Sequence, residues 1–172
     1  MQGVDYMTFV VPGLVMLSIV TTSYSNTSFT FFTSKFFARS IDEILVSPTP
    51  PWLLIVGFIG GGVVRGFLTG TLVLLVSLFF TDISLSIASV LIIAGFAFLT
   101  ALVFALAGLV NGIYAKSMDG ISIVPTFVLT PLVYLGGVFY SIHTLPEWWQ
   151  TLTYANPLFY LINGFRYGFF GV

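Results

Sequence analysis

The chain has 172 residues, of which 58% are hydrophobic and 6% are charged, whereas soluble domains carry roughly a quarter charged residues. A soluble fold of this size could not bury so much apolar surface, so we expect an integral membrane protein. The net charge of −1, the absence of cysteine and the single histidine argue against a nucleic-acid partner, disulfide frameworks and metal sites, and no catalytic residue is expected.

Four apolar intervals are long enough to cross a bilayer as helices, which takes about 20 residues each. We place these helices near Thr8–Phe32, Trp52–Phe80, Leu85–Tyr114 and Ile121–Phe139. Helices satisfy their own backbone hydrogen bonds in lipid. The expected fold is therefore an all-α polytopic helical bundle forming a single transmembrane domain over residues 1–172.

The basic residues between the spans predict the orientation of the bundle. Lys35 and Arg39 follow the first span and Lys116 follows the third, whereas the link after the second span carries only Asp82. Because Lys and Arg favour cytoplasmic loops, we expect these two loops inside and the chain's start outside. This predicts a fragment that lacks a spanning segment at each end; the alternative is a four-helix protein with its N-terminus outside.

The first cytoplasmic loop, "SKFFARSIDEILVSPTPPW", contains the pattern of a short helix. Ser40 and Glu43 form an S-x-x-E capping box, and Asp42 and Glu43 suit a first helical turn. Residues 44–46 give the helix an apolar side, and the prolines at 48–51 end it. Two interpretations remain open: a connecting helix at the membrane surface, or a docking helix for a cytoplasmic partner.

The second span is rich in glycine at intervals of four residues. Gly57 and Gly61 form one pair, and Gly62, Gly66 and Gly70 form a series. Glycines four residues apart share a helix face and allow another helix to approach closely. They indicate packing within the bundle or, as the alternative, the lining of a transport path.

Arg65 lies inside the second predicted span. Ionisable side chains in a span usually face the bundle interior or water. We expect either an aqueous or partner-facing position near a transport route, or an arginine that reaches the cytoplasmic headgroups.

The end of the fourth span predicts a break in the helix. Pro125 and Pro131 weaken its hydrogen-bond ladder, and Gly136 and Gly137 allow a turn. His143 then lies in a region that we interpret as the outer interface, where it is an interfacial polar residue.

Two short helices are expected to follow, as a re-entrant hairpin on the outer side. Thr144 and Glu147 form a second capping box for a helix over Leu145–Tyr154, with Pro146 in its first turn. Its two tryptophans, Trp148 and Trp149, suit the headgroup boundary. For the second helix, Asn156 is the expected N-cap and Pro157 the expected first residue.

The sequence contains no site for ATP. The nearest approach to a phosphate-binding loop, "VNGIYAKS", has Val110 and Ala115 where that loop requires glycine. Asp82 and Glu147 both lie near the outer surface, so no buried acidic pair indicates a proton relay.

Two stretches, "RSIDEILVSP" and "GGVFYSIHTLPEWWQTLTYANPLFYLINGFRYG", resemble the membrane-spanning permease of type 2 ABC transporters. The chain looks closest to bacterial inner-membrane permeases grouped with polysaccharide, nodulation-factor and drug exporters, and the resemblance covers nearly all of it. The family implies six spans, so this chain would lack the first span and most of the sixth. It also implies a second permease subunit, as a homodimer, and a separate subunit that binds ATP and Mg.

The resemblance also assigns roles to residues. A coupling helix that docks into the ATP-binding subunit would comprise Arg39, Ser40, Asp42, Glu43, Ile44, Leu45 and Pro48. An outer re-entrant gate would comprise Gly136, Gly137, Thr144, Pro146, Glu147, Trp148, Trp149, Asn156, Pro157 and Arg166. Residues Gly62, Arg65, Gly66 and Gly70 remain candidates for pathway or packing.

We therefore expect a non-enzymatic permease subunit of an ATP-driven exporter, in contact with lipid and with an unknown exported substrate. Amphiphiles, lipid-linked glycans and drugs fit its apolar spans equally. The alternatives are a membrane protein of assembly or signalling without transport, and an ion-coupled secondary transporter.

Overall fold

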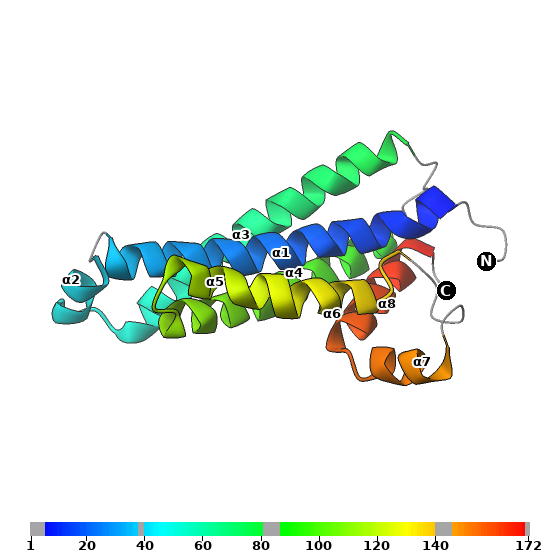
Figure 1. The fold of residues 1–172 in the computed structure, drawn as a ribbon. Coiled ribbons are helices and arrows are strands. Elements are labelled where there is room, and N and C mark those ends of the chain that lie inside the picture. Colours follow the sequence, from blue (N-terminus) through cyan, green and yellow to red (C-terminus); the bar gives the residue numbers. More distant parts are fainter. Residues whose placement is uncertain (1–5, 38–39, 81–86, 140–145, 171–172) are drawn as a thin grey trace.

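The computed structural model describes residues 6–37, 40–80, 87–139 and 146–170, and these residues form a bundle of helices (Figure 1). Four stretches are long and apolar enough to cross a membrane: Thr8–Phe36, Pro51–Leu78, Ser89–Tyr114 and Met118–Leu135. The prediction of four spans in an all-α fold is confirmed. The helices are α1 (Tyr6–Phe36), α2 (Ser40–Val46), α3 (Pro51–Leu78), α4 (Ile87–Tyr114), α5 (Met118–Val124), η1 (Pro125–Leu129), α6 (Thr130–Leu135), α7 (Glu147–Tyr154) and α8 (Pro157–Phe170).

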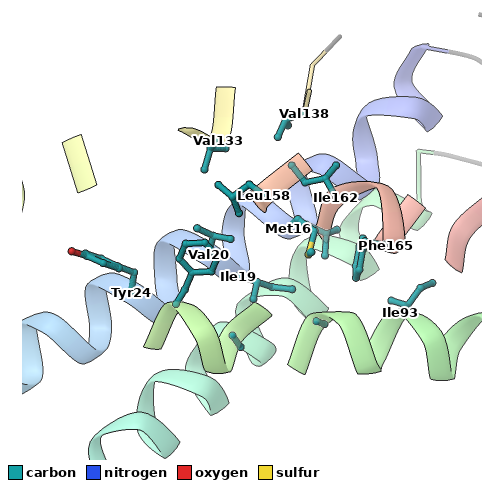
Figure 2. Packing of buried hydrophobic residues seen from close by; sticks show 14 of the residues in the cluster. Met16, Ile19, Val20, Tyr24, Ile93, Val133, Val138, Leu158, Ile162 and Phe165 are labelled. Atoms are coloured by element: carbon teal, nitrogen blue, oxygen red, sulfur yellow. The ribbon is translucent and has the colours of Figure 1, made fainter. Parts of the chain in front are cut away.

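Helix α1 is the centre of the bundle and packs against α3, α4 and α8 (Figure 1). Figure 2 shows the core where α1 meets α8 and the end of α6. The fully buried side chains there include Met16, Ile19, Val20, Val133, Val138, Leu158, Ile162 and Phe165. Side chains of α1 therefore pack directly against side chains from the C-terminal third of the chain.

The glycine series of α3 packs against α1. The space that a Cβ would need on Gly62, Gly66 and Gly70 is filled by Thr27, Ser23 and Ile19, respectively. Gly57 and Gly61 differ, because a Cβ on either would meet no atom within 4 Å. Glycines with the same four-residue spacing therefore differ in their surroundings. The later three form a face packed against α1, and the earlier pair borders open space.

The fourth span differs from its predicted bounds and remains continuous at its prolines. It begins at Met118, after Ser117, whose hydroxyl accepts a hydrogen bond from the Gly120 amide at 3.1 Å. Pro131 has no N–H to donate and its ring would clash with the carbonyl four residues earlier. The helix widens instead into a π-turn, η1, in which the Thr130 amide bonds to Pro125 O. It ends at Leu135 rather than Phe139, and Gly137 then adopts a φ of 77°.

Both predicted capping boxes are out of register with the helices. Helix α2 already includes Ser40, which the box would place before the first turn. Helix α7 begins at Glu147, directly after Pro146, whereas a box capped by Thr144 needs Glu147 in the third helical position. Thr144 and His143 lie outside the described residues, as does Arg39.

The two basic loops lie at the same end of the bundle. Lys35 Nζ, at the end of α1, donates a hydrogen bond of 2.9 Å to Ile113 O, near the end of α4. Helix α2 lies at this end and α7 at the opposite end (Figure 1). This arrangement is the one that the basic-loop prediction requires, and the side of the membrane on which each end lies stays a prediction.

Candidate functional site

Helix α2 forms the first candidate region, at the end of the bundle that carries the basic residues. Its Ile41 is buried in a cluster with Phe31 of α1 and Leu109 of α4. Its other apolar side chains point outward: Ile44, Leu45 and Val46 are 38%, 63% and 88% exposed. The helix is therefore anchored through one side chain and presents an apolar edge.

The corner after α2 is held by hydroxyl groups. Ser47 Oγ donates to Ile44 O at 2.6 Å and lies 2.6 Å from Thr49 Oγ1. Helix α3 starts two residues later with Pro51, where its fixed φ suits the first helical position. These bonds and the prolines connect α2 to α3 through a short, constrained corner.

The second candidate region is a polar groove on α1, bordered by α3 and α5. Eight consecutive residues of α1, 21–28, read "TTSYSNTS". Within this run Ser23, Thr27 and Ser28 are buried in the bundle. The other polar side chains line a groove of about 590 Å³ whose lining comprises Thr21, Thr22, Ser25, Asn26, Phe29, Arg65, Ile121, Ser122 and Pro125.

Arg65 brings a positive charge to this groove. Its Nη1 donates a hydrogen bond of 2.7 Å to Asn26 Oδ1 on α1. It lies about 21 Å along the axis from the start of α3 at 1.5 Å per residue, which is far longer than its side chain. Arg65 therefore lies near the middle of α3, and its side chain is directed toward α1 and the groove and not toward an end of its helix.

Arg166 forms part of the third candidate region, where α8 meets the turn after α6. Its Nη2 donates to Gly137 O at 2.8 Å and to Val138 O at 3.2 Å. Its guanidinium also lies 4.0 Å from the centre of the Phe9 ring on α1. One side chain thus joins α8, α1 and the turn at Gly137.

Asn156 makes a second connection between the same elements. Its Oδ1 accepts a hydrogen bond of 3.0 Å from the Leu158 amide, so it caps α8 as predicted, and α8 begins at Pro157. Its Nδ2 donates to Leu132 O at 2.6 Å. Because Gly136 N donates to the same carbonyl at 3.0 Å, Asn156 fixes the last turn of α6 beside the start of α8. We refer to Asn156, Arg166 and the turn at residues 136–138 as the clamp.

Trp148 and Trp149 of α7 lie beyond the clamp. Their ring centres are 4.2 Å apart, and Trp148 is exposed. Adjacent indole rings at one end of the bundle are typical of a headgroup boundary.

The predicted site residues in the described part of the chain lie on α2, at the groove, on the packed face of α3, in the clamp and on α7. The structure brings Gly137, Asn156 and Arg166 together, while Ser40, Asp42 and Glu43 belong to α2, at the opposite end of the bundle (Figure 1). Sequence reasoning missed Asn26 and its hydroxyl neighbours. The signal was present, since eight polar or tyrosyl residues in succession are unusual within an apolar span.

Comparison with known proteins identifies the family to which these three regions belong. The family model described as "ABC-2 type transporter" matches residues 2–170. The chain belongs to the ABC-2 type transporter family. This ABC-2 family chain is 52% identical, over all 172 of its residues, to "Inner membrane transport permease YadH" of Escherichia coli (strain K12) and covers 66% of that protein.

A more distant relative is "Nodulation protein J" of Rhizobium meliloti (strain 1021). The ABC-2 family chain is 26% identical to it over 167 residues, which are 96% of the chain and 62% of the relative. The chain therefore spans about two thirds of the length of the curated relatives it matches. No solved structure shows a significant match. The family, the relatives and the four apolar helices together identify a multi-pass protein of the inner membrane.

Proposed function

We propose that the chain is the membrane-spanning part of a permease subunit in an ATP-driven exporter. It would supply the substrate pathway and couple the movement of substrate to ATP hydrolysis by a separate ATP-binding subunit. The name "transport permease" of the Escherichia coli relative supports a role in transport. A single transmembrane permease domain over residues 1–172 fits the family match to residues 2–170.

The observation that carries this proposal is the geometry of α2. A short helix that begins with Asp42 and Glu43 in its first turn leaves an apolar edge exposed at the end with the basic loops. Apolar side chains beyond the spans are costly to leave in water. A protein surface that covers Ile44 and Leu45 would remove this cost, and α2 could pass movement to α1 through Ile41 and to α3 through the corner at Ser47.

The remaining parts of the proposal follow from a shared substrate path. Two copies of the permease would form the path between them, as a homodimer, beside lipid. ATP and Mg²⁺ would bind to the partner subunit, and this chain would perform no catalysis. The clamp and α7 would form the outer gate, and the groove at Arg65 would lie along the route of the exported substrate.

Co-purification of the full-length protein with its ATP-binding partner tests the docking role. Ile44→Asp and Leu45→Asp each place a charge in the proposed apolar interface, where charge is poorly tolerated. We expect each to reduce the recovered partner by about tenfold or more. Phe79→Asp is the matched control, because Phe79 is 87% exposed just beyond the far end of α3.

The docking proposal fails if both α2 variants retain the partner as well as the wild type does. It also fails if Phe79→Asp loses the partner to the same extent, since the effect would then be general destabilisation. Full-length variants that remain monodisperse in detergent make the comparison valid.

A further inference from the structure

The groove contains a cation, Arg65, and its described lining residues include no acid that could neutralise it. Neither α1 nor α3 contains an Asp or Glu. The third bordering helix, α5, carries Asp119 in its first turn, which is not among the lining residues. Within the described part of the chain, the hydrogen bond that the structure records for the Arg65 side chain goes to the uncharged amide of Asn26. A guanidinium has five N–H donors. The bond to Asn26 uses one of them, so the other donors can bind the oxygens of an anion.

The surroundings of Arg65 supply further hydrogen-bonding groups. Thr21, Thr22, Ser25 and Ser122 place hydroxyls along the groove. An arginine fork with nearby hydroxyls matches the oxygens of a phosphate, sulfate or carboxylate. A charge within a span is costly unless it is paired, so an anion that enters the groove gains more than it would gain from an arginine in water.

Beside the groove, α3 carries apolar side chains that are exposed on the surface of the bundle. Arg65, Leu68 and Leu72 share a face of α3 because they follow the spacing i, i+3 and i+7, and the two leucines are 59% and 62% exposed. Phe29 of α1, also exposed, lines the groove itself. A ligand with a charged head in the groove can therefore lay an alkyl chain along α3.

We propose that this groove binds the anionic head of an amphiphile, with Arg65 and Asn26 at its centre. The binding site stands on the geometry above, and its role as the substrate site rests on the proposed transport function. Asn26 orients the guanidinium, and Arg65 contacts the anion. The substrate class is then an anionic amphiphile rather than a neutral glycolipid or a cationic drug.

Direct binding to the full-length protein tests this proposal without any ATP-binding partner. The protein is placed in phosphatidylcholine nanodiscs, and binding of radiolabelled dodecyl phosphate is measured after subtraction of empty nanodiscs. Neutral dodecyl glucoside and inorganic phosphate serve as comparison probes. We expect dodecyl phosphate to bind at least about tenfold more tightly than either.

Two substitutions examine the charge itself. Arg65→Gln removes the cation, and Asn26→Asp keeps the size of the side chain while placing a carboxylate against Arg65. Both should weaken dodecyl phosphate binding by about tenfold or more and leave dodecyl glucoside unchanged. Lys116→Gln removes one positive charge outside the residues that line the groove and should bind like the wild type.

The proposal is overturned if Asn26→Asp, folded as judged by its melting curve, binds dodecyl phosphate like the wild type. It is also overturned if the glucoside binds as tightly, or if inorganic phosphate binds as tightly, which would indicate a site for free anions. Ile44→Asp should bind dodecyl phosphate normally. A failure of partner docking and a failure of anion binding are therefore read from separate measurements.

Discussion

Position 108 of α4 requires glycine, because a backbone group of α1 occupies the space that a side chain would need. A Cβ at this position would overlap the carbonyl oxygen of Tyr24, and a Cβ on Gly112, one turn later, would lie 2.9 Å from Ser28 O. A backbone carbonyl in the middle of a helix cannot rotate aside as a side chain can. Small residues on α4 thus set how closely the two helices approach.

Gly108→Ala should consequently destabilise the protein. Overpacking of a close contact costs about 1–3 kcal/mol, which exceeds the gain of at most about 1 kcal/mol from the better helix propensity of alanine. Thermal unfolding of the purified protein in detergent measures the difference. Gly95→Ala, on the same helix, meets no atom within 4 Å and should be neutral or slightly stabilising; equal melting temperatures for the two variants would contradict this account.

Single residues were predictable from the sequence where spacing or charge marked them. The prediction of a packed glycine face rests on the four-residue spacing of Gly62, Gly66 and Gly70 and does not include Gly108 and Gly112, which have the same spacing. The charge of Arg65 marks it in the sequence, whereas its partner Asn26 carries no charge and is marked only by the run of polar residues at 21–28, which the prediction did not use. The distinction between the packed glycines and the open pair Gly57 and Gly61 depends on which face meets α1, and spacing does not reveal that.

The start of α8 and the end of α6 depend on one side chain. Asn156 caps α8 with its Oδ1 and holds Leu132 O with its Nδ2, and it is buried. Loss of an N-cap costs about 1 kcal/mol, and loss of a buried hydrogen bond costs a similar amount. The clamp therefore concentrates two structural functions in one amide.

Asn156→Ala should lower the free energy of unfolding by about 2 kcal/mol. Asn163→Ala is the control on the same helix, because Asn163 is exposed and its removal should change stability by less than about 0.5 kcal/mol. Chemical unfolding in mixed micelles compares the two. If Asn156→Ala and Asn163→Ala have the same free energy of unfolding, the clamp does not hold α6 and α8 together.

Helix boundaries were predictable where local chemistry alone sets them. The pair Asn156 and Pro157 specifies a helix start by itself, and the structure agrees. Helix α7 begins at Glu147 and not at the predicted Leu145, because Pro146 stands immediately before the helix and not within it. The π-turn η1 was not predicted, since two prolines in a span indicate weakness without saying whether the helix breaks or widens.

The molecule as a whole is organised along α1, which touches all three candidate regions. Phe9 of α1 lies against Arg166 in the clamp, Asn26 holds Arg65 in the groove, and Phe31 packs with Ile41 of α2. One continuous helix therefore extends from the proposed docking site, past the proposed anion site, to the proposed gate. A movement of α2 toward or away from a partner would reach the other two regions through this helix.

The number of spans and the shared end of the basic loops could be predicted from hydropathy and charge. The central position of α1 could not, because helices in a membrane are apolar on every side. Hydrophobic periodicity then no longer tells the face that meets protein from the face that meets lipid. The arrangement depends instead on small residues and hydroxyls, whose partners only the structure shows.

The most direct test of the proposed function measures transport and ATP hydrolysis together. The full-length protein and its ATP-binding partner are reconstituted in proteoliposomes, and movement of a labelled amphiphile is followed with ATP or with an imposed proton gradient. The account predicts that the permease raises the rate of ATP hydrolysis, that ATP drives movement, and that Ile44→Asp abolishes both effects. Movement that follows the proton gradient without ATP, or hydrolysis that the permease does not change, would contradict it.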